Sequence, residues 1–290
     1  MSKAMVQANT RFTTCGDMLP AARRWLLGAV LIVGATGLAA CPPAADVKGG
    51  GAGFSVEALA ADPAALLRAA DEQDALAAPR NSLAALERAQ KTQPDWASGP
   101  GAYDLQWRLA RAYAALAEPD GDQRVTAVPA GVQAAKRAIE LGADRVEGHY
   151  YMAQLQGFSA LLQKGETRPF LQAFVSEAEA AIKADEKFDA GGPLRIVGVL
   201  YARAPKEPVS VGDPEKAVQY MKRAVAVAPD YPANQFFLAE AYVADERYSE
   251  AESALATARK LLADPKWDAR RTSWRELLSR VERKLKAKQN

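Results

Sequence analysis

Few side chains in this chain are capable of metal, redox or nucleophilic chemistry. Its 290 residues include one histidine, His149, and two cysteines, Cys15 and Cys41. A structural zinc site takes four such ligands, and a catalytic zinc site usually takes three protein ligands. No Ser or Cys nucleophile stands out with a matching acid, and we expect a hydrogen-bonded structural role for His149. The sequence therefore predicts a protein that is not an enzyme and that holds no metal and no cofactor.

A second set of side chains, aromatic and charged, recurs at constant positions of a helical repeat. When the chain is aligned on Ala110, Ala153, Gly198 and Ala239, the residues three before and one after them are Trp107, Arg111, Tyr150, Gln154, Arg195, Val199, Phe236 and Glu240. In a helical solenoid these positions line the concave face, so we expect them to form one groove.

The chemistry of this predicted groove suits a hydrophobic or carboxylated ligand, or an inserted peptide. Flat aromatic rings bury a large area at low entropic cost, and a guanidinium binds a carboxylate in a bidentate fork. Arg195 and Arg111 are then the residues expected to hold the carboxylate. The alternative, that the aromatic side chains pack against adjacent helices, is open at this stage.

The elements that must position these residues are predicted to be helices. Residues 232–263 resemble a tetratricopeptide repeat, with Ala239 on a first helix and Ala258 on a second. The second-helix pattern that ends at Ala258 also occurs 34 residues earlier, where it ends at Ala224. The same small residue recurs at Ala181 and Ala138. Small residues let two helices approach closely. We therefore predict an all-α fold over residues 57–290, an α-solenoid of tetratricopeptide-like helix pairs closed by a C-terminal capping helix over 266–288.

Three middle repeats are longer than the last one. We measured the distance in sequence from the Tyr position of the first helix, which is Gln156 in one repeat, to the recurring Ala of the second helix. This distance is 25, 25 and 23 residues in the three middle repeats and 16 in the last. We predict that the additional residues form loops near 118–121, 164–169 and 204–208. Loops on one side of successive repeats would build a rim or a second surface, although neutral insertion is an alternative.

The N-terminal segment is predicted to direct export. Arg23 and Arg24 precede sixteen uncharged residues and then Cys41. A spanning helix usually needs about 20 apolar residues, so 1–40 fits a signal peptide better than a retained anchor. Residues 38–41 (Leu-Ala-Ala-Cys) resemble a lipoprotein cleavage site, which implies that Cys41 carries lipid.

The segment 41–56 is rich in Pro, Gly and Ala and is predicted to be a flexible tether. Pro42 stands where an Asp would signal inner-membrane retention in many Gram-negative bacteria. We therefore expect an outer-membrane lipoprotein that faces the periplasm.

The charge distribution argues against a nucleic-acid partner. The net charge is +2, and the clearest basic excess lies in 264–290, with nine Lys and Arg against four Asp and Glu. We interpret this segment as the solvated face of a terminal helix rather than a nucleic-acid or lipid site.

Two strings extend the resemblance to a particular family. Residues 148–153 read Gly-His-Tyr-Tyr-Met-Ala and 191–195 read Gly-Gly-Pro-Leu-Arg. With the lipoprotein signal, they resemble the TatT family, lipoproteins associated with tripartite ATP-independent periplasmic (TRAP) transporters, from about Leu66 to Leu261. The resemblance implies cryptic tetratricopeptide repeats, a trimer, a hydrophobic chamber in each subunit and docking with a periplasmic substrate-binding protein. A pilotin-like assembly scaffold that binds a peptide segment of an outer-membrane complex is the alternative.

The signal prediction can be tested at Cys41. Replacing Cys41 with Ala is expected to release the protein from membranes or to block its maturation, because the thiol is the attachment point of the lipid. Intact-mass analysis of the wild-type chain from its native host should give a lipidated N-terminus at Cys41. An unmodified chain that starts at Met1 would contradict the prediction.

Overall fold

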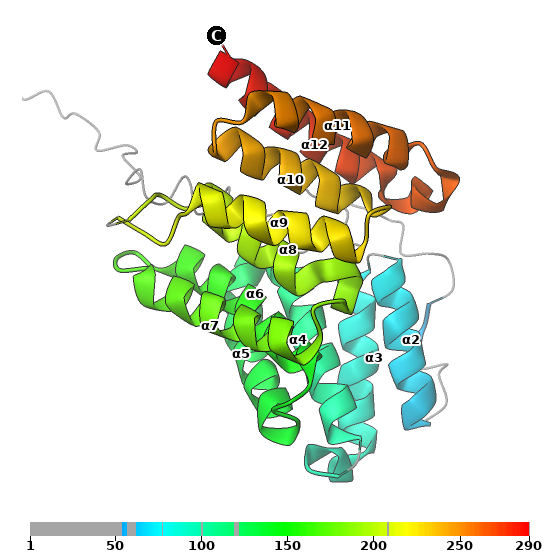
Figure 1. The fold of residues 1–290 in the computed structure, drawn as a ribbon. Helices are drawn as coiled ribbons and strands as arrows, with labels where there is room; N and C mark the ends of the chain where they lie inside the picture. The colour runs from blue at the N-terminus through cyan, green and yellow to red at the C-terminus, as the bar shows by residue number, and fades with distance from the viewer. Residues whose placement is uncertain are drawn as a thin grey trace, which may run out of the picture.

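The computed structural model describes residues 54–56, 62–76, 78–99, 101–118, 122–207 and 209–289, so the predicted signal peptide, Cys41 and most of the tether lie outside it. Within these residues the fold is all-α, with one isolated β-bridge between Lys206 and Gly212 (Figure 1). No helix in this part of the chain is long and apolar enough to cross a membrane.

The described helices pair in chain order as the repeats require. The helices are α2 (Pro63–Ala75), α3 (Pro79–Thr92), α4 (Ala102–Ala117), α5 (Asp122–Leu141), α6 (Val146–Leu162), α7 (Arg168–Asp185), α8 (Phe188–Arg203), α9 (Pro214–Val227), α10 (Pro232–Ala244), α11 (Tyr248–Leu262) and α12 (Asp268–Gln289). Short 3₁₀ turns at Pro94–Ala97 and Pro265–Trp267 precede α4 and α12. The most extensive contacts join α2 to α3, α4 to α5, α6 to α7, α8 to α9 and α10 to α11. The prediction of an all-α solenoid with a terminal helix is confirmed.

Local sequence explains where several helices begin. Asp62 precedes Pro63, and its carboxylate accepts hydrogen bonds from the backbone N–H groups of Ala64 (3.1 Å) and Ala65 (3.2 Å). Asp213 caps α9 in the same way, 3.0 Å from the Lys216 backbone nitrogen. Proline at the first helical position has its φ preset and lacks an N–H that would otherwise be unpaired. These Asp-Pro pairs therefore fix the first turns of α2 and α9.

The small residues used to align the repeats do lie at the helix crossings. Ala110, Ala153, Ala239 and the second-helix residues Ala138, Ala181, Ala224 and Ala258 are all completely buried. At Gly198 a Cβ would lie 2.8 Å from the Met221 side chain and 3.3 Å from the Ala217 carbonyl oxygen, so a larger residue there would have to displace Met221. The helix register predicted from these positions is correct.

The additional residues of the middle repeats are mostly helical, which corrects the prediction of long loops. Helices α5, α6 and α7 have 20, 17 and 18 residues, whereas α10 and α11 of the last repeat have 13 and 15. Within the three middle pairs of the described chain, the longest connection joins α8 to α9, over 204–213, whereas α4–α5 and α6–α7 are joined over 118–121 and 163–167. Helical extension satisfies the backbone hydrogen bonds of these residues internally, whereas a loop would have to find other partners for them.

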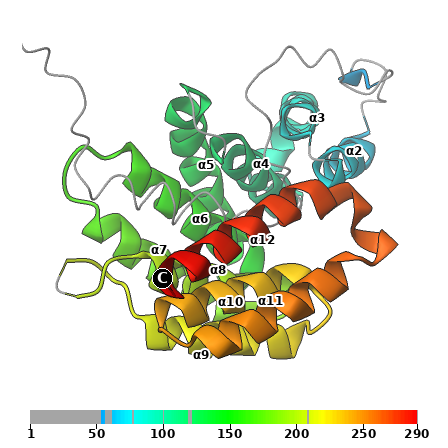
Figure 2. The same ribbon diagram turned by 90° about the horizontal axis from the view of Figure 1, so that it is seen from above.

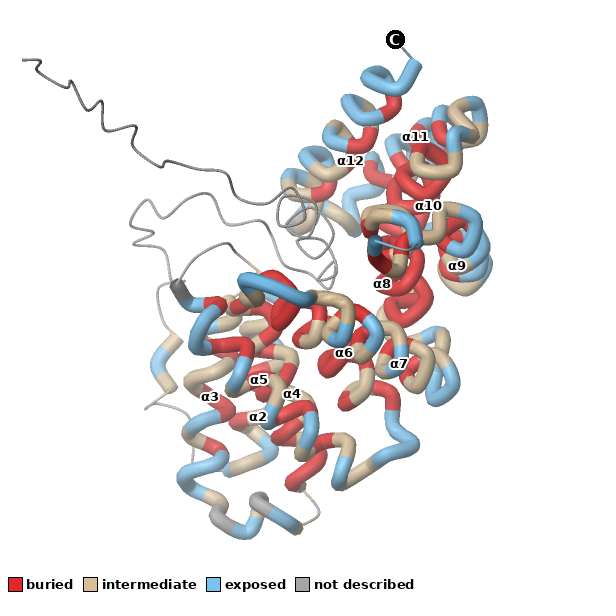
Figure 3. Tube along the Cα trace, turned by 90° about the vertical axis from the view of Figure 1, so that its left-hand side faces the viewer, coloured by how far each residue is buried: buried red, intermediate tan, exposed pale blue. Residues whose placement is uncertain are grey.

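Two hydrophobic clusters form the core and meet at α8. Ile196, Val197 and Leu200 of this helix pack with α2 to α7, whereas Leu194 and Val199 pack with α9 to α12. Figure 3 shows α8 and α10 buried along most of their length, and residues 191–200 and 232–243 are all buried. The two halves of the solenoid therefore share one central helix.

The terminal helix α12 covers one side of the second cluster. It packs on α10 and α11, and seen from above it crosses from the C-terminal side toward the end of α2 (Figure 2). Trp274, Leu278 and Val281 of α12 are buried in this cluster, and Leu277 and the preceding Trp267 are partly buried. The capping role predicted for this segment follows from these contacts.

The helix crossing at Ala258 provides a test of the packing. Ala258→Leu is expected to lower the free energy of unfolding by about 1–3 kcal/mol, because a larger side chain must push α11 away from its neighbours. Ala256→Leu is the matched control, since Ala256 is exposed on the same helix. Urea unfolding followed by circular dichroism measures both; equal stability of the two variants would show that the crossing is not tightly packed.

Candidate functional site

The predicted groove residues lie on the first helices of four successive pairs but do not all reach one surface. Trp107 and Arg111 belong to α4, Tyr150 and Gln154 to α6, Arg195 and Val199 to α8, and Phe236 and Glu240 to α10. Arg111 lines a pocket beside the start of α8, and Trp107, Tyr150 and Arg195 contact other residues that line it. The residues of α10 and Val199 lie in the second hydrophobic cluster and in an ion network beneath α12.

An aromatic group extends from α4 to α8. The Trp107 ring is nearly parallel to that of Tyr151, at 6.2 Å and 5°. Tyr150 makes edge contacts with Tyr151 at 5.2 Å and Phe188 at 5.3 Å. Arg111 lies over the Trp107 ring, with its guanidinium carbon 5.1 Å from the centroid. Tyr151, which the repeat alignment did not select, thus joins Trp107 to Tyr150.

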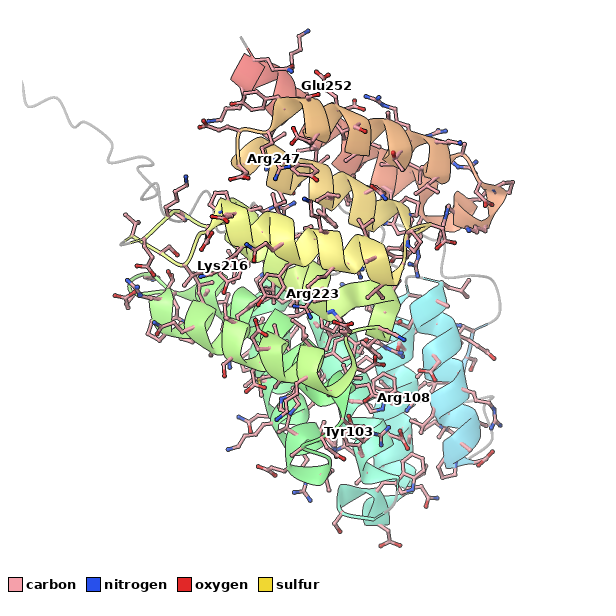
Figure 4. All side chains as sticks on the ribbon, viewed as in Figure 1. Tyr103, Arg108, Lys216, Arg223, Arg247 and Glu252 are labelled. Carbon is pink, nitrogen blue, oxygen red and sulfur yellow. The ribbon has the colours of Figure 1, made fainter. Side chains whose placement is uncertain are left out.

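Two aspartates of α2 pair with the arginines of α4. Arg108, labelled in Figure 4, donates through Nε to Asp71 Oδ1 (2.9 Å) and through Nη2 to Oδ2 (3.0 Å), and Arg111 Nη2 donates to the same Oδ1 at 2.7 Å. Burial acts to raise the pKa of Asp71, but these hydrogen bonds outweigh it and lower the pKa below its usual range. Asp74 lies one turn later, 3.4 Å from Arg111 Nε, and its pKa is raised, chiefly by burial. One aspartate is therefore fully engaged and the other only weakly.

Arg195 is buried within a network and does not face open solvent. Its side chain is 1% exposed, and Nη2 donates to Asp189 Oδ2 at 2.7 Å while Nη1 donates to Asn234 Oδ1 at 3.0 Å. Tyr150 donates its hydroxyl proton to the same Asp189 oxygen at 3.0 Å. Burial, followed by the charge of Asp189, raises the pKa of Tyr150 well above its usual value, so the hydroxyl keeps that proton. The Arg195 guanidinium, which was predicted to hold a ligand carboxylate, is therefore paired with the carboxylate of Asp189.

The same network holds an unusual backbone corner. Asp189, Ala190 and Gly191 all have positive φ, at 49°, 53° and 81°, although only glycine adopts this region without strain. Arg195 donates to the carbonyl oxygens of Asp189 and Ala190, both at 3.2 Å, and Asn234 Nδ2 donates to that of Ala190 at 3.0 Å. These bonds offset a strain of about 1–3 kcal/mol per residue and fix where Phe188 and Asp189 lie.

Glu240 forms a buried ion network that joins three helices. Arg203 of α8 donates through Nε to Glu240 Oε1 at 3.0 Å, and Lys284 of α12 contacts the same oxygen. The Arg203 and Glu240 side chains are each 4% exposed. Burial acts to raise the pKa of Glu240, but the two cations outweigh it and lower the pKa to about 2. Glu240 therefore ties α12 to the solenoid instead of lining an open groove.

The remaining predicted groove residues are also enclosed. Phe236 is completely buried and packs on Phe237, with ring centroids 4.5 Å apart. Val199 is 2% exposed in the same cluster. Gln154 is 2% exposed, and its Nε2 has no hydrogen-bond partner among the described residues. For Phe236 and Val199, packing between helices is the role that the structure gives.

A pocket of about 240 Å³ opens beside the Asp189 corner. It is lined by Asp74, Ala75, Arg111, Tyr151, Phe188, Asp189 and Arg270. Repeat alignment selected only Arg111 among them. Asp189 lies just before the Gly191 string, but Asp74 and Arg270 come from the two ends of the solenoid and carried no sequence signal. A second, apolar hollow of about 510 Å³ lies between α5, α6 and α7, beside Pro129 and Phe170.

The pocket combines charged and aromatic side chains. Among the described residues no three His, Cys, Asp or Glu side chains are grouped as metal ligands. His149 is hydrogen-bonded through Nδ1 to Glu177 (2.6 Å) and through Nε2 to the Ala143 carbonyl oxygen (2.9 Å), the structural role expected for it. What the pocket offers is cationic, anionic and aromatic groups in one small volume.

Comparison with known proteins supports the repeat fold. Residues 209–271 match the model of the tetratricopeptide repeat family. The solved structure of TTC0263, a thermophilic tetratricopeptide-repeat protein of Thermus thermophilus, covers 77% of this chain and 98% of its own, at 20% identity and a TM-score of 0.57. The tetratricopeptide-repeat domain of P58(IPK) aligns with 79% of this chain and 58% of its own, at 16% identity and a TM-score of 0.30. No curated protein sequence matches the chain.

These comparisons show a protein that contains tetratricopeptide repeats, a fold that generally serves as a scaffold for binding other proteins. They indicate no enzyme family.

The Glu240 network predicts a specific acid sensitivity. Folding lowers the pKa of the Glu240 carboxyl. The contribution of Glu240 to stability is therefore complete above its ordinary pKa of 4.5 and is lost as the pH falls toward about 2. Glu240→Gln is expected to lower the free energy of unfolding by about 3–5 kcal/mol at pH 7, because two cations lose their partner. The difference from wild type should shrink between pH 4.5 and pH 2.

Urea unfolding at a series of pH values measures this effect. Glu252→Gln is the control, because Glu252 is exposed on α11 and accepts a hydrogen bond from the exposed, uncharged Gln289 at 2.9 Å (Figure 4). A Glu240→Gln variant as stable as the control at pH 7 would contradict the prediction.

Proposed function

We propose that this protein is a non-catalytic, lipid-anchored repeat protein on the periplasmic face of the outer membrane. In this proposal Cys41 holds the chain at the membrane, and the solenoid docks a substrate-binding protein of a TRAP transporter and holds a small hydrophobic or carboxylate ligand. Support comes from the lipoprotein-like signal, the repeat fold and the residues of the TatT-like strings. Tyr150 and Arg195, one from each string, are two of the groups that organise the Asp189 corner.

One structural observation favours a docking role most directly. The α8–α9 connection presents Val209, which is 72% exposed, from a loop whose base is closely packed. Gly212 donates to the Pro205 carbonyl oxygen at 2.8 Å, and a Cβ there would lie 2.0 Å from the Ala204 oxygen. An apolar side chain on a constrained loop loses little entropy when a partner buries it.

The neighbouring loop belongs to the same surface. Arg168, at the start of α7, donates through Nη2 to both Glu207 carboxylate oxygens, at 2.7 and 2.8 Å. The α6–α7 and α8–α9 connections lie at one edge of the solenoid, on the left of Figure 1. We name residues 163–168, 204–207 and 209–213 the loop rim and propose that it is the docking surface for the partner. Self-association into a trimer, which the TatT resemblance implies, is part of the same proposal.

The docking role can be tested at Val209. Val209→Asp is expected to weaken binding to the TRAP substrate-binding protein encoded nearest to this protein by at least tenfold, because it places a charge at the centre of the apolar contact. Leu76→Asp is the matched control, since Leu76 is also 72% exposed but lies in the α2–α3 turn. Surface plasmon resonance with both purified proteins measures the affinities.

The outcomes separate the two candidate functions. Equal binding by the two variants would show that the partner does not dock at the loop rim. No binding by the wild-type protein, together with co-purification of an outer-membrane oligomer, would overturn the TRAP proposal in favour of the pilotin-like scaffold.

A further inference from the structure

The pocket beside the Asp189 corner is assembled from both ends of the solenoid. Asp74 comes from α2, Arg111 from α4 and Tyr151 from α6, all of which pack in or on the first hydrophobic cluster. Arg270 comes from α12, which packs on the second. Pockets at the junction of two packed units are common ligand sites. A molecule bound here would contact both halves of the protein at once.

Several polar groups in the pocket have unused hydrogen-bonding capacity toward described residues. Arg111 Nε is buried without a hydrogen-bond partner, although it lies 3.4 Å from Asp74. Arg270 donates one hydrogen bond, from Nη1 to the Tyr231 hydroxyl at 3.1 Å, out of the five donors that a guanidinium carries. Asp189, in contrast, is already engaged by Tyr150 and Arg195. The free capacity therefore lies with Arg111, Arg270, Asp74 and the Tyr151 hydroxyl.

The two cations that line the pocket differ in their partners. Arg111 pairs with Asp71 and lies 3.4 Å from Asp74. Among the described residues no salt bridge joins Arg270 to a carboxylate, and its hydrogen-bond partner is the Tyr231 hydroxyl. A ligand carboxylate would give Arg270 an anionic partner, and Asp74 can accept one hydrogen bond from the same molecule.

The size of the pocket limits the ligand. Its volume of about 240 Å³ is below the 300–1,000 Å³ of sites for drug-sized molecules. Phe188 and Ala75 give it a small apolar wall. A molecule of a few heavy atoms with a short apolar side chain fits these limits.

We propose that this pocket binds a small monocarboxylate that also carries a hydroxyl or ammonium group, such as an α-hydroxy or α-amino acid. The carboxylate accepts hydrogen bonds from Arg270, Arg111 and the Tyr151 hydroxyl, the hydroxyl or ammonium donates to Asp74, and the side chain packs on Phe188. This inference rests on the ligand-binding part of the proposed function and gives it a site and a ligand class.

Titration calorimetry with the full chain tests the carboxylate. The probes are glycolate, L-lactate, L-alanine and L-valine, each beside its methyl ester. At least one free acid is expected to bind and its ester is not, because the ester lacks the negative charge. Arg270→Gln should raise the Kd at least tenfold. Arg275→Gln, an exposed position on the same helix, should leave it within twofold. Absence of binding by every free acid at 10 mM, or equal effects of the two variants, overturns the proposal.

Asp74 gives a second, independent measurement. The wild-type protein is expected to prefer L-lactate over propionate, which has no hydroxyl, and Asp74→Asn should reduce that preference. Circular dichroism checks that the variants are folded. A preference unchanged in Asp74→Asn would remove Asp74 from the site and overturn the proposed ligand class.

A carboxylate could also come from the C-terminus of a polypeptide. The tripeptide Gly-Gly-Ala is therefore titrated beside L-alanine, and binding by the tripeptide alone would overturn the small-molecule proposal. The titrations contain no partner protein, so their outcome is separate from that of the Val209→Asp experiment. Loss of docking leaves the pocket result unchanged, and the reverse also holds.

Discussion

The buried contact between Arg195 and Asp189 is the interaction on which the middle of this molecule depends. It neutralises the buried guanidinium of Arg195 and holds a corner in which Asp189 and Ala190 adopt left-handed backbone angles. Without it the corner would keep its strain and the buried charge of Arg195 would lack its partner, a cost of several kcal/mol. The corner sets the direction of α8, and this helix contributes residues to both hydrophobic clusters. The position of the pocket is a consequence of the same contact.

Close helix approach and ionic contacts have different roles in this solenoid. Completely buried small residues, such as Ala153 and Ala239, set the distance between helices but give few directional contacts. The Glu240 network fixes the position of α12 relative to α8, because a buried carboxylate must meet both Arg203 and Lys284. Apolar contacts supply the compact packing, and charged groups specify the arrangement of successive pairs.

The sequence was sufficient to predict the fold class and the register of the repeats, because Ala138, Ala181, Ala224 and Ala258 mark the same crossing each time. It was insufficient for the pocket, whose members Asp74 and Arg270 are almost 200 residues apart. Equivalence in the repeat also failed to predict exposure. Phe236 and Trp107 occupy the same repeat position, yet α12 encloses Phe236, whereas Trp107 stays partly exposed. Local patterns describe a repeat, whereas the ends of a solenoid decide which of its concave residues face solvent.

The polar character of the pocket has a consequence for motion. Within each hydrophobic cluster, separating helices exposes apolar surface at about 25 cal/mol per Å². Across the pocket, the facing groups are Asp74 and Arg111 on one side and Arg270 on the other, and water can hydrate all three when they separate. Opening the two halves at this point therefore costs less than opening either cluster. A molecule that joined Arg270 to Tyr151 would oppose that opening, so occupancy of the pocket and the position of α12 are thermodynamically linked.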